Sequence, residues 1–143
     1  MSVEIRPARP SDAERISPLL TELGYPTPPA DVAHRLSALA GPEDAILVAD
    51  DANGAIVGLM GLHRLSALHA AAPACYITAL VVASAARGRG VGRRLLEAAE
   101  SRAREWGCSR IVVTSAERRA DAHAFYEGCG FERTGRRFVR ALA

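Results

Sequence analysis

The sequence predicts one α/β domain built on a central mixed β-sheet of about seven strands flanked by about four helices. The chain has 143 residues, the length of one domain. Short apolar runs alternate along it with segments whose apolar residues recur at helical spacing. A strand–helix–strand unit in the middle predicts two parallel neighbouring strands. No segment is repeated or of low complexity, so we expect a single domain over residues 1–143.

Capping and turn residues mark the elements of the first half. The first helix opens at Ser11, with Glu14 in capping-box spacing, and closes at Gly24. The second has Thr27 as its expected N-cap, and an Asn-Gly turn at 53–54 predicts a hairpin. The expected elements are a strand at 3–6, helices at 11–24 and 27–41, and strands at 45–50 and 55–63.

The second half contains the expected parallel pair. The strand at 75–83 is apolar on nearly both faces, as in a central strand. A helix at 90–106 leads to its parallel neighbour at 109–114. The last expected elements are a helix at 119–128 and two closing strands at 130–135 and 136–142.

Charge is divided unevenly along a chain that contains no lysine and carries a net charge of +2. Residues 1–86 hold five arginines and nine acidic residues, whereas residues 87–143 hold thirteen arginines and seven acidic residues. A basic second half favours an anionic ligand, and an acidic first half tolerates a cationic one. Ordinary surface charge is the alternative.

Composition also limits the class of protein. No apolar run is long enough to span a bilayer, and the N-terminus lacks the apolar stretch of a signal peptide. The cysteines at 75, 108 and 129 are odd in number and widely spaced, which indicates reduced thiols. We therefore expect a cytoplasmic protein. His63 and His69 have no further ligands in register, so no metal site is expected.

A glycine-rich, arginine-rich turn at 87–93 joins the central strand to the long helix. A helix N-terminus exposes unpaired N–H groups and a partial positive charge, and glycines let a bulky anion approach the backbone. The turn therefore predicts a phosphate site. A Walker loop is excluded because the chain has no lysine, and GxGxxG fails because Arg93 and Leu95 occupy the third glycine's positions.

The pattern Arg87-x-x-Gly90-x-Gly92, between a strand and a long helix, resembles the acyl-CoA pyrophosphate loop of the GNAT superfamily of N-acyltransferases. The stretch AHAFYEGCGF at 122–131 is similar to that family's second signature. The element order matches across nearly the whole chain. The resemblance implies a GNAT-like fold in which a splayed pair of parallel strands holds the cofactor.

The resemblance further implies that the cofactor is acetyl-CoA. Backbone N–H groups of the loop would bind its pyrophosphate at Arg87, Gly88, Arg89, Gly90, Val91, Gly92 and Arg93. The pantetheine arm would pair with the main chain at Leu80, Val81 and Val82. An N–H near Val82 would hold the thioester carbonyl, as in an oxyanion hole.

Tyr126 matches the tyrosine that often donates a proton to the departing CoA thiolate. Its alternative role is that of a half-buried aromatic. Arg119 stands where relatives often carry asparagine, and it would contact phosphate or pantetheine or face solvent. Relatives also carry an acidic residue on the strand before the loop, where this chain has Thr78 and Ala79.

The base that deprotonates the amine is therefore unassigned at this stage. The candidates are Glu22, His63, His123 and ordered water. We expect the acceptor to enter beside the turn between the first two helices, where Tyr25 and Pro26 would shape its site. Glu22, Tyr25 and His63 are accordingly the predicted substrate-binding residues.

These observations predict an N-acetyltransferase in which a primary amine attacks acetyl-CoA directly in a ternary complex. The first alternative is a non-catalytic acyl-CoA-binding regulatory domain, which release of free CoA with an amine would exclude. The second is an arginine-rich nucleic-acid binder, although the arginines alternate with glutamates and aromatic residues are few. We expect neither nucleic acid nor membrane as a partner. A homodimer could form through the closing edge at 136–143.

Overall fold

The computed structural model describes residues 2–114 and 120–142, which belong to two compact units, Met1–Val112 and Val113–Ala143. The elements of the larger unit are β1 (Glu4–Pro7), a 3₁₀ turn (Pro10–Asp12), α1 (Ala13–Leu23), α2 (Pro29–Ala38), β2 (Asp44–Asp50), β3 (Ile56–Leu65), β4 (Ala74–Val82), a second 3₁₀ turn (Ser84–Ala86), α3 (Val91–Glu105) and β5 (Arg110–Val113), which ends at the boundary. The smaller unit contains α4 (Ala120–Gly128). None of the described helices has the length and hydropathy needed to cross a bilayer.

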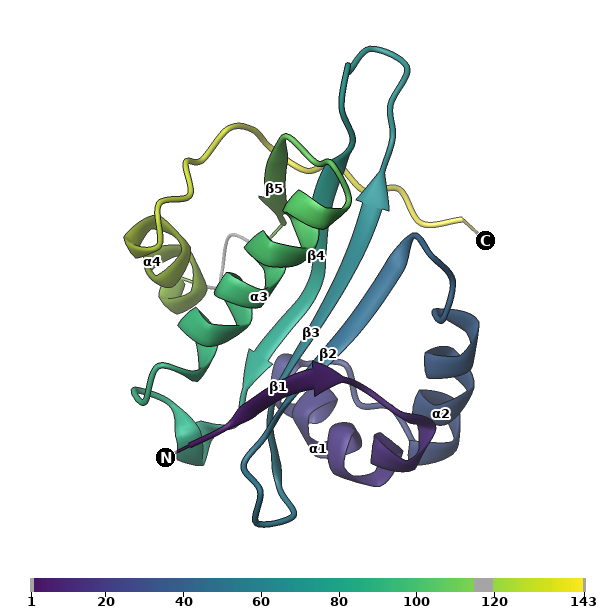
Figure 1. The fold of residues 1–143 in the computed structure, drawn as a ribbon, viewed down its shortest axis with the longest axis vertical. Helices are drawn as coiled ribbons and strands as arrows, with labels where there is room; N and C mark the ends of the chain where they lie inside the picture. The colour runs from purple at the N-terminus through teal and green to yellow at the C-terminus, as the bar shows by residue number, and fades with distance from the viewer. Residues whose placement is uncertain (1, 115–119, 143) are drawn as a thin grey trace. The chain divides into compact units, whose positions relative to one another are not determined.

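The sheet has the strand order β1-β2-β3-β4-β5 (Figure 1). The first four strands pair antiparallel, with Asp44 opposite His63 between β2 and β3 and His63 opposite Tyr76 between β3 and β4. β4 and β5 point the same way in Figure 1, on either side of the α3 crossover, so the sheet is mixed. The α/β class with a mixed sheet is confirmed.

The prediction of about seven strands is wrong, because the described sheet has five. The two closing strands expected at 130–135 and 136–142 are not formed, and residues 131–142 carry no regular secondary structure. Phe138 and Leu142 in this stretch are 90% and 92% exposed. Residues that favour an extended backbone do not by themselves make a strand, because a strand also needs a neighbouring edge to pair with.

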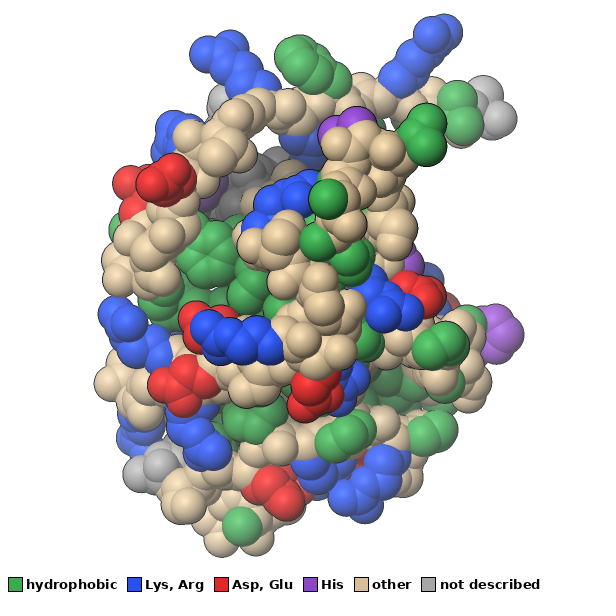
Figure 2. Space-filling model, turned by 45° about the horizontal axis from the view of Figure 1, so that its top comes forward, with side chains coloured by type: hydrophobic (Ala, Val, Ile, Leu, Met, Phe, Trp, Pro, Cys, Tyr) green, Lys and Arg blue, Asp and Glu red, His purple; other side chains and the backbone are tan. Residues whose placement is uncertain are grey.

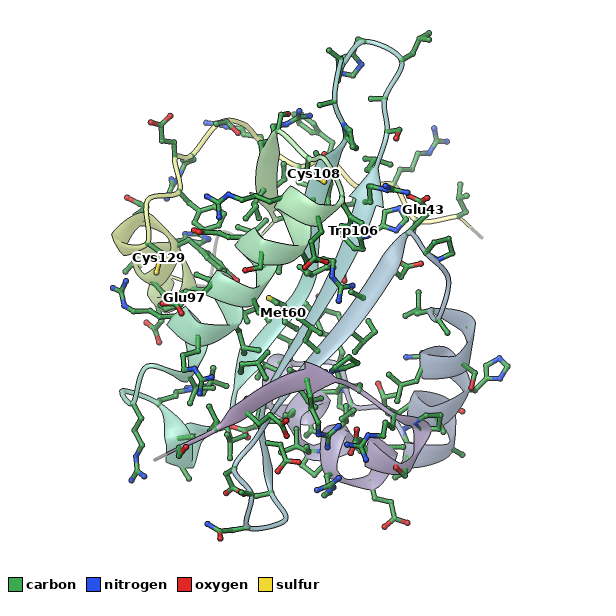
Figure 3. The ribbon with its side chains drawn as sticks, viewed as in Figure 1. Glu43, Met60, Glu97, Trp106, Cys108 and Cys129 are labelled. Atoms are coloured by element: carbon green, nitrogen blue, oxygen red, sulfur yellow. The ribbon has the colours of Figure 1, made fainter. Side chains whose placement is uncertain are left out.

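The sheet is covered on both faces. Toward α1, Leu59 and Val81 pack in one buried cluster with Ile16. Toward α3, a Cβ added to Gly58 would lie 3.0 Å from Leu95 Cδ1. Because neighbouring strand residues point to opposite faces, α1 and α3 pack on opposite sides of β3. Met60, labelled in Figure 3, lies in the middle of the sheet and is fully buried.

Two helix starts differ from those expected. α1 begins at Ala13 after a 3₁₀ turn, with Asp12 and not Ser11 at the N-cap position. α2 has Pro28 at its N-cap, and the hydroxyl of Thr27 instead donates to the Tyr25 carbonyl oxygen at 2.8 Å. The expected end of α1 is confirmed, since Gly24 is its C-cap residue.

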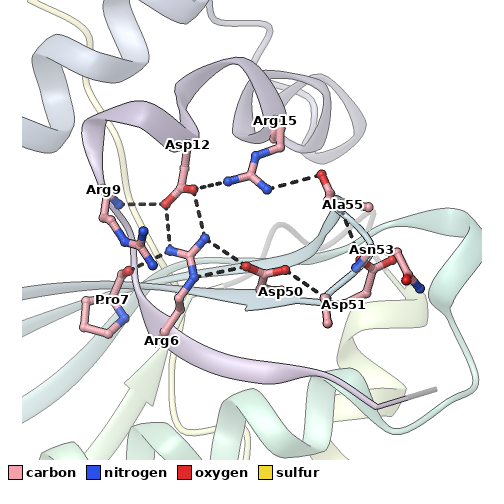
Figure 4. A network of polar contacts seen from close by, with 11 residues as sticks. Arg6, Pro7, Arg9, Asp12, Arg15, Asp50, Asp51, Asn53 and Ala55 are labelled. Atoms are coloured by element: carbon pink, nitrogen blue, oxygen red, sulfur yellow. Dashed lines mark hydrogen bonds and ion pairs between the residues drawn. The ribbon is translucent and has the colours of Figure 1, made fainter.

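A buried charged cluster of Arg6, Asp12, Arg15 and Asp50 ties β1 to the start of α1 and to the end of β2 (Figure 4). Arg6 donates to both carboxylate oxygens of Asp12 at 2.9 Å and to Asp50 at 3.1 and 3.2 Å. Asp12 is fully buried, and its bond with Arg6 holds the pKa of its carboxyl group well below the usual range. Both oxygens of this carboxylate therefore have a donor.

Candidate functional site

The glycine loop, residues 87–93, lies where β4 passes through the 3₁₀ turn Ser84–Ala86 into α3. Gly88 and Gly90 adopt positive φ angles of 78° and 82°, which a residue with a side chain rarely adopts. Nothing lies within 4 Å of a Cβ built on either glycine, so the space beside the backbone is open. The local conformation therefore requires glycine and leaves room for a bulky group.

The N-terminus of α3 has backbone donors that the described residues do not use. Gly90 is the N-cap, and no side chain of the described residues caps the helix by a hydrogen bond. The N–H of Arg94 donates to the Gly90 carbonyl oxygen at 3.1 Å. The amides of Val91, Gly92 and Arg93 precede it and have no helical acceptor four residues back. These amides and the helix dipole favour an anion at this end.

The arginine side chains of the loop are exposed. Neither Arg89 nor Arg93 forms an ion pair with any described residue, and Arg87 donates from Nε to the Val82 carbonyl oxygen at 3.2 Å. Near the end of α3, Arg104 instead lies 3.6 Å from Glu100, and Arg102 lies 3.6 Å from Glu105. Figure 2 shows blue and red side chains intermixed over the face drawn. Arg89 and Arg93 are therefore loop cations without an anionic partner among the described residues.

β4 extends beyond its neighbour β5. β5 has four residues against nine in β4, and the two strands begin at the same level, where the Ser109 N–H donates to the Pro73 carbonyl oxygen at 3.0 Å. The second half of β4, which includes Leu80, Val81 and Val82, consequently continues past the end of β5. This half of the strand leads directly into the glycine loop, so the predicted pantetheine and pyrophosphate positions lie along one continuous path of main chain.

A bulge interrupts β4 just before this segment. The register shifts between Gly61 and Leu62, which pair with Ala79 and Ile77, so Thr78 is the extra residue. Thr78 is exposed, and its hydroxyl oxygen lies only 2.5 Å from the position that a Cβ on Gly61 would take. Gly61 is therefore needed for close packing beneath the bulge. Thr78 and Ala79 bring no carboxylate to this position, as the sequence indicated.

Glu22, a predicted substrate-binding residue, is bound to the lead-in of the glycine loop. Its carboxylate accepts hydrogen bonds from the Ser84 hydroxyl and from the Ser84 N–H, the latter at 3.0 Å. The hydroxyl bond, followed by the N–H bond and the charge of Arg87, lowers the pKa of the Glu22 carboxyl group. A carboxylate held in this way is a weak base, and it fastens the end of α1 to the turn before the loop.

His63 lies at the end of β3, and its Nδ1 is 2.8 Å from Oδ1 of Asp44 on the neighbouring strand. The His63 side chain is 39% exposed and that of Asp44 is 21% exposed. Glu43, labelled in Figure 3 at the same end of the sheet, forms an ion pair of 2.7 Å with Arg64. Tyr25 is 67% exposed in the turn between α1 and α2, where the acceptor site was expected.

Tyr126 belongs to the smaller unit. It is buried on α4, and its ring makes edge contacts with Phe125 and Phe131 at centroid distances of 5.6 and 5.7 Å. The N–H groups of Cys129 and Phe131 both donate to its carbonyl oxygen at 3.0 Å. His123 is on the same helix. Arg119 lies outside the described residues.

Two residues of the site were missed in the sequence. Asp44 and Ser84 lie 19 and 62 residues from the partners His63 and Glu22, and neither belongs to a motif. The hairpin register could have indicated Asp44, because residues opposite each other on antiparallel strands are neighbours. Nothing in the sequence indicated Ser84. Among the described residues, no three His, Cys, Asp or Glu side chains are grouped as a metal site would require.

The glycine loop fits the phosphates of coenzyme A. Uncapped amides and the side chains of Arg89 and Arg93 supply donors that a diphosphate needs, and the open space beside two glycines gives it room. The second half of β4 offers strand backbone to an extended arm. When bound, acetyl-CoA would supply an activated thioester, which these residues would hold and orient.

Comparisons with known proteins give a family and named relatives. A model of the acetyltransferase (GNAT) family matches residues 13–131. An aminoalkylphosphonate N-acetyltransferase of Salmonella typhimurium is 38% identical over 63% of this chain, and the match spans 58% of that relative's length. An aminoglycoside N(6')-acetyltransferase of Stenotrophomonas maltophilia is 31% identical over 92% of this chain, and the match spans 88% of that relative's length.

A solved structure, described as a transcriptional regulator from Bacillus halodurans, has a TM-score of 0.87 to this chain. Its sequence is 27% identical, and the match covers 99% of this chain and 100% of the Bacillus halodurans chain. The predicted acyltransferase class and the predicted donor, acetyl-CoA, agree with the family match and with the names of both N-acetyltransferase relatives. The chain belongs to the GNAT family of acetyltransferases.

Proposed function

We propose that this protein transfers the acetyl group of acetyl-CoA to a primary amine by direct attack of the amine in a ternary complex. The glycine loop binds the diphosphate, and Leu80–Val82 bind the pantetheine arm. An N–H near Val82 polarises the thioester carbonyl. The amine nitrogen forms a bond to the carbonyl carbon, the carbon–sulfur bond breaks, and the CoA thiolate takes a proton.

The observation that supports this proposal best is the start of α3. Its first amides are uncapped, Gly90 has a positive φ with open space beside it, and Arg89 and Arg93 lack anionic partners among the described residues. A buried structural turn would have these donors satisfied within the protein. Their arrangement next to the uncovered half of β4 suits an anionic group with an extended arm.

The acceptor is tested by a panel of amines. The named relatives act on aminoalkylphosphonates and aminoglycosides, so the panel contains 2-aminoethylphosphonate and kanamycin. Wild-type protein is incubated with acetyl-CoA and each amine, and release of free CoA is followed together with the mass of the acetylated product. We expect amine-dependent release of CoA. Calorimetry that detects no binding of acetyl-CoA would contradict the proposal.

Tyr126 is the proposed general acid for the departing thiolate. Replacing Tyr126 by Phe keeps the aromatic ring and removes the hydroxyl group. We expect turnover to fall about 10²-fold, the usual contribution of general acid catalysis, with unchanged binding of acetyl-CoA. A loss of less than about threefold, far below the ~10²-fold contribution of general acid catalysis, would show that the hydroxyl has no such role. Phe125→Leu, on the same helix, controls for loss of packing.

Further parts of the proposal concern the whole protein. We propose one N-acetyltransferase domain over residues 1–143 and a cytoplasmic location, in keeping with cysteines that are all free thiols. Arg119 is a proposed contact for phosphate or pantetheine, and Tyr25 for the acceptor. The exposed apolar side chains of Phe138, Val139 and Leu142 support a homodimer, which sedimentation equilibrium would test.

A further inference from the structure

We propose that Glu22 selects the acceptor by binding a second ammonium group of the amine, so that the protein prefers diamines and polyamines. This inference rests on the proposed function and names the substrate class of the same site. Glu22 is the specificity-determining residue, and Ser84 is a positioning residue that orients the Glu22 carboxylate.

The first step is the direction of the Val82 N–H, which the proposed function assigns to the thioester carbonyl. Val82 is opposite Gly58, and the N–H of the next residue, Ala83, donates to the Val57 carbonyl oxygen at 2.8 Å. In an antiparallel pair, bonded and non-bonded residues alternate, so Val82 belongs to a non-hydrogen-bonded pair. Its N–H and C=O therefore point away from β3, toward the side on which β5 has already ended.

The second step is the short distance from this N–H to Glu22. The Ser84 N–H donates to Oε1 of Glu22 at 3.0 Å, and Ser84 follows Val82 by two residues. Because two residues of chain span at most about 7 Å, Oε1 lies within about 10 Å of the Val82 nitrogen. Tyr25, the proposed acceptor contact, is exposed in the turn that follows Glu22. A small acceptor that reacts beside Val82 can therefore reach Glu22 with a second group.

The third step is the unused binding capacity of the Glu22 carboxylate. Both hydrogen bonds from Ser84 fall on Oε1, and no described residue donates to Oε2 or forms an ion pair with Glu22. The side chain is exposed, and the bonds from Ser84 and the charge of Arg87 lower the pKa of its carboxyl group, so it is an anion at neutral pH. Oε2 can therefore accept hydrogen bonds from an ammonium group. Because Ser84 already fixes the carboxylate, little side-chain freedom is lost when the group binds.

The charges around Glu22 favour a cationic group over an anionic one. The charge of Arg87 acts on Glu22, but Nε of Arg87 donates to the Val82 carbonyl oxygen at 3.2 Å. The other loop cations, Arg89 and Arg93, would be neutralised by the diphosphate of the proposed function. An ammonium at Oε2 gains a charge-assisted hydrogen bond, whereas a phosphonate at the same place is repelled by the carboxylate.

Glu22→Gln separates this role from the contact with Ser84. Glutamine keeps the length of the side chain, and its amide oxygen can still accept both Ser84 bonds, whereas the negative charge is lost. Glu14→Gln is the matched control, because Glu14 is exposed on the first turn of the same helix and forms no ion pair with a described residue. The affinity for acetyl-CoA should stay within about twofold of wild type in both variants, since exposed charges outside the loop contribute little.

The binding test uses amines that differ in one charged group. The whole chain is saturated with coenzyme A and titrated calorimetrically with putrescine, a diamine, with butylamine, its monoamine counterpart, and with 2-aminoethylphosphonate, an amine with an anionic group. We expect putrescine to bind wild type about tenfold more tightly than the other two, the usual contribution of a charge-assisted hydrogen bond. Glu22→Gln should remove this preference, and Glu14→Gln should keep it.

The kinetic test measures the same preference with acetyl-CoA as donor. In Glu22→Gln the KM for putrescine should rise about tenfold, while kcat stays within about threefold of wild type, because the second ammonium does not react. The constants for butylamine should not change.

The proposal is overturned if wild type binds putrescine no more tightly than butylamine, or if Glu22→Gln retains the preference. An equal loss in Glu14→Gln would assign the effect to the overall charge of α1. A loss of acetyl-CoA affinity in Glu22→Gln would assign Glu22 to the shape of the loop, and either of these results also overturns the proposal. Absence of CoA release with every amine would instead contradict the proposed function, because the binding preference can still be measured in that case.

Discussion

Arg6 in the buried charged cluster and Arg89 in the glycine loop are the same residue type in opposite surroundings. Arg6 is 8% exposed and donates to Asp12, Asp50 and the Pro7 carbonyl oxygen. Arg89 is exposed and forms no ion pair with any described residue. The backbone differs in the same way, because Asp12 accepts the Arg9 N–H at 2.8 Å, whereas no side chain among the described residues caps the start of α3.

This contrast shows how to separate structural arginines from ligand-binding ones. In the buried charged cluster, donors and acceptors balance within the protein, so removing a partner affects folding. In the glycine loop, donors exceed acceptors, and the missing acceptor is expected to come from a ligand. The four predictions below test this division, from the largest expected effect to the smallest.

Replacing Asp12 by Asn should destabilise the protein strongly. The change leaves Arg6 and its charge in a buried place without its main partner, and breaking a buried pair costs about 3–5 kcal/mol. Urea denaturation would measure the free energy of unfolding. Asp31→Asn, on the exposed first turn of α2, should change it by less than about 0.5 kcal/mol. If the two variants lose the same amount, the cluster is not a stabilising element.

The cluster should also produce acid sensitivity. The pKa of Asp12 is lowered in the folded state, first by its bond with Arg6, relative to about 3.9 in an unfolded chain. Its contribution is therefore complete above about pH 4 and is lost as pH falls below that value. We expect the difference in unfolding free energy between wild type and Asp12→Asn to be smaller at pH 3 than at pH 7. A gap that widens on acidification would contradict the sign of this shift.

Gly90→Ala should weaken binding of acetyl-CoA about tenfold, while stability falls by about 1 kcal/mol because alanine is strained at a positive φ. Gly54→Ala is a closely matched control. Gly54 also has a positive φ, of 90°, with nothing within 4 Å of an added Cβ, but it lies in the β2–β3 turn. We expect a similar loss of stability and no change in calorimetric affinity. Equal affinities for both variants would place the diphosphate elsewhere.

Arg89→Gln should have the smallest effect, a several-fold rise in the KM for acetyl-CoA that diminishes as salt is added. The melting temperature should not change, since Arg89 contacts no described acidic group. Arg104→Gln on α3, which removes the 3.6 Å pair with Glu100, should leave the KM unchanged. A lower melting temperature with unchanged KM would assign Arg89 to structure.

The most predictable parts of the chain were those in which neighbours in sequence are neighbours in space. The capping of α3 by Gly90 and the end of α1 at Gly24 follow from local backbone preferences. The β2–β3 hairpin follows from its turn. The two expected closing strands were wrong for a related reason, since residues 131–142 have no described pairing edge and a strand depends on a partner distant in sequence.

The candidate site shows the same difference between features set by neighbouring residues and contacts set by the tertiary structure. The sequence by itself determined the glycine loop and its position after a central strand, because a strand, a turn and a helix N-terminus are consecutive in the chain and their geometry is local. Only the tertiary structure brought Asp44 to His63 and Ser84 to Glu22, and it gave Arg6 two carboxylates from separate elements. Such pairs depend on strand register and on helix packing against the sheet. Those are set by burial of the whole apolar core, which no single segment encodes.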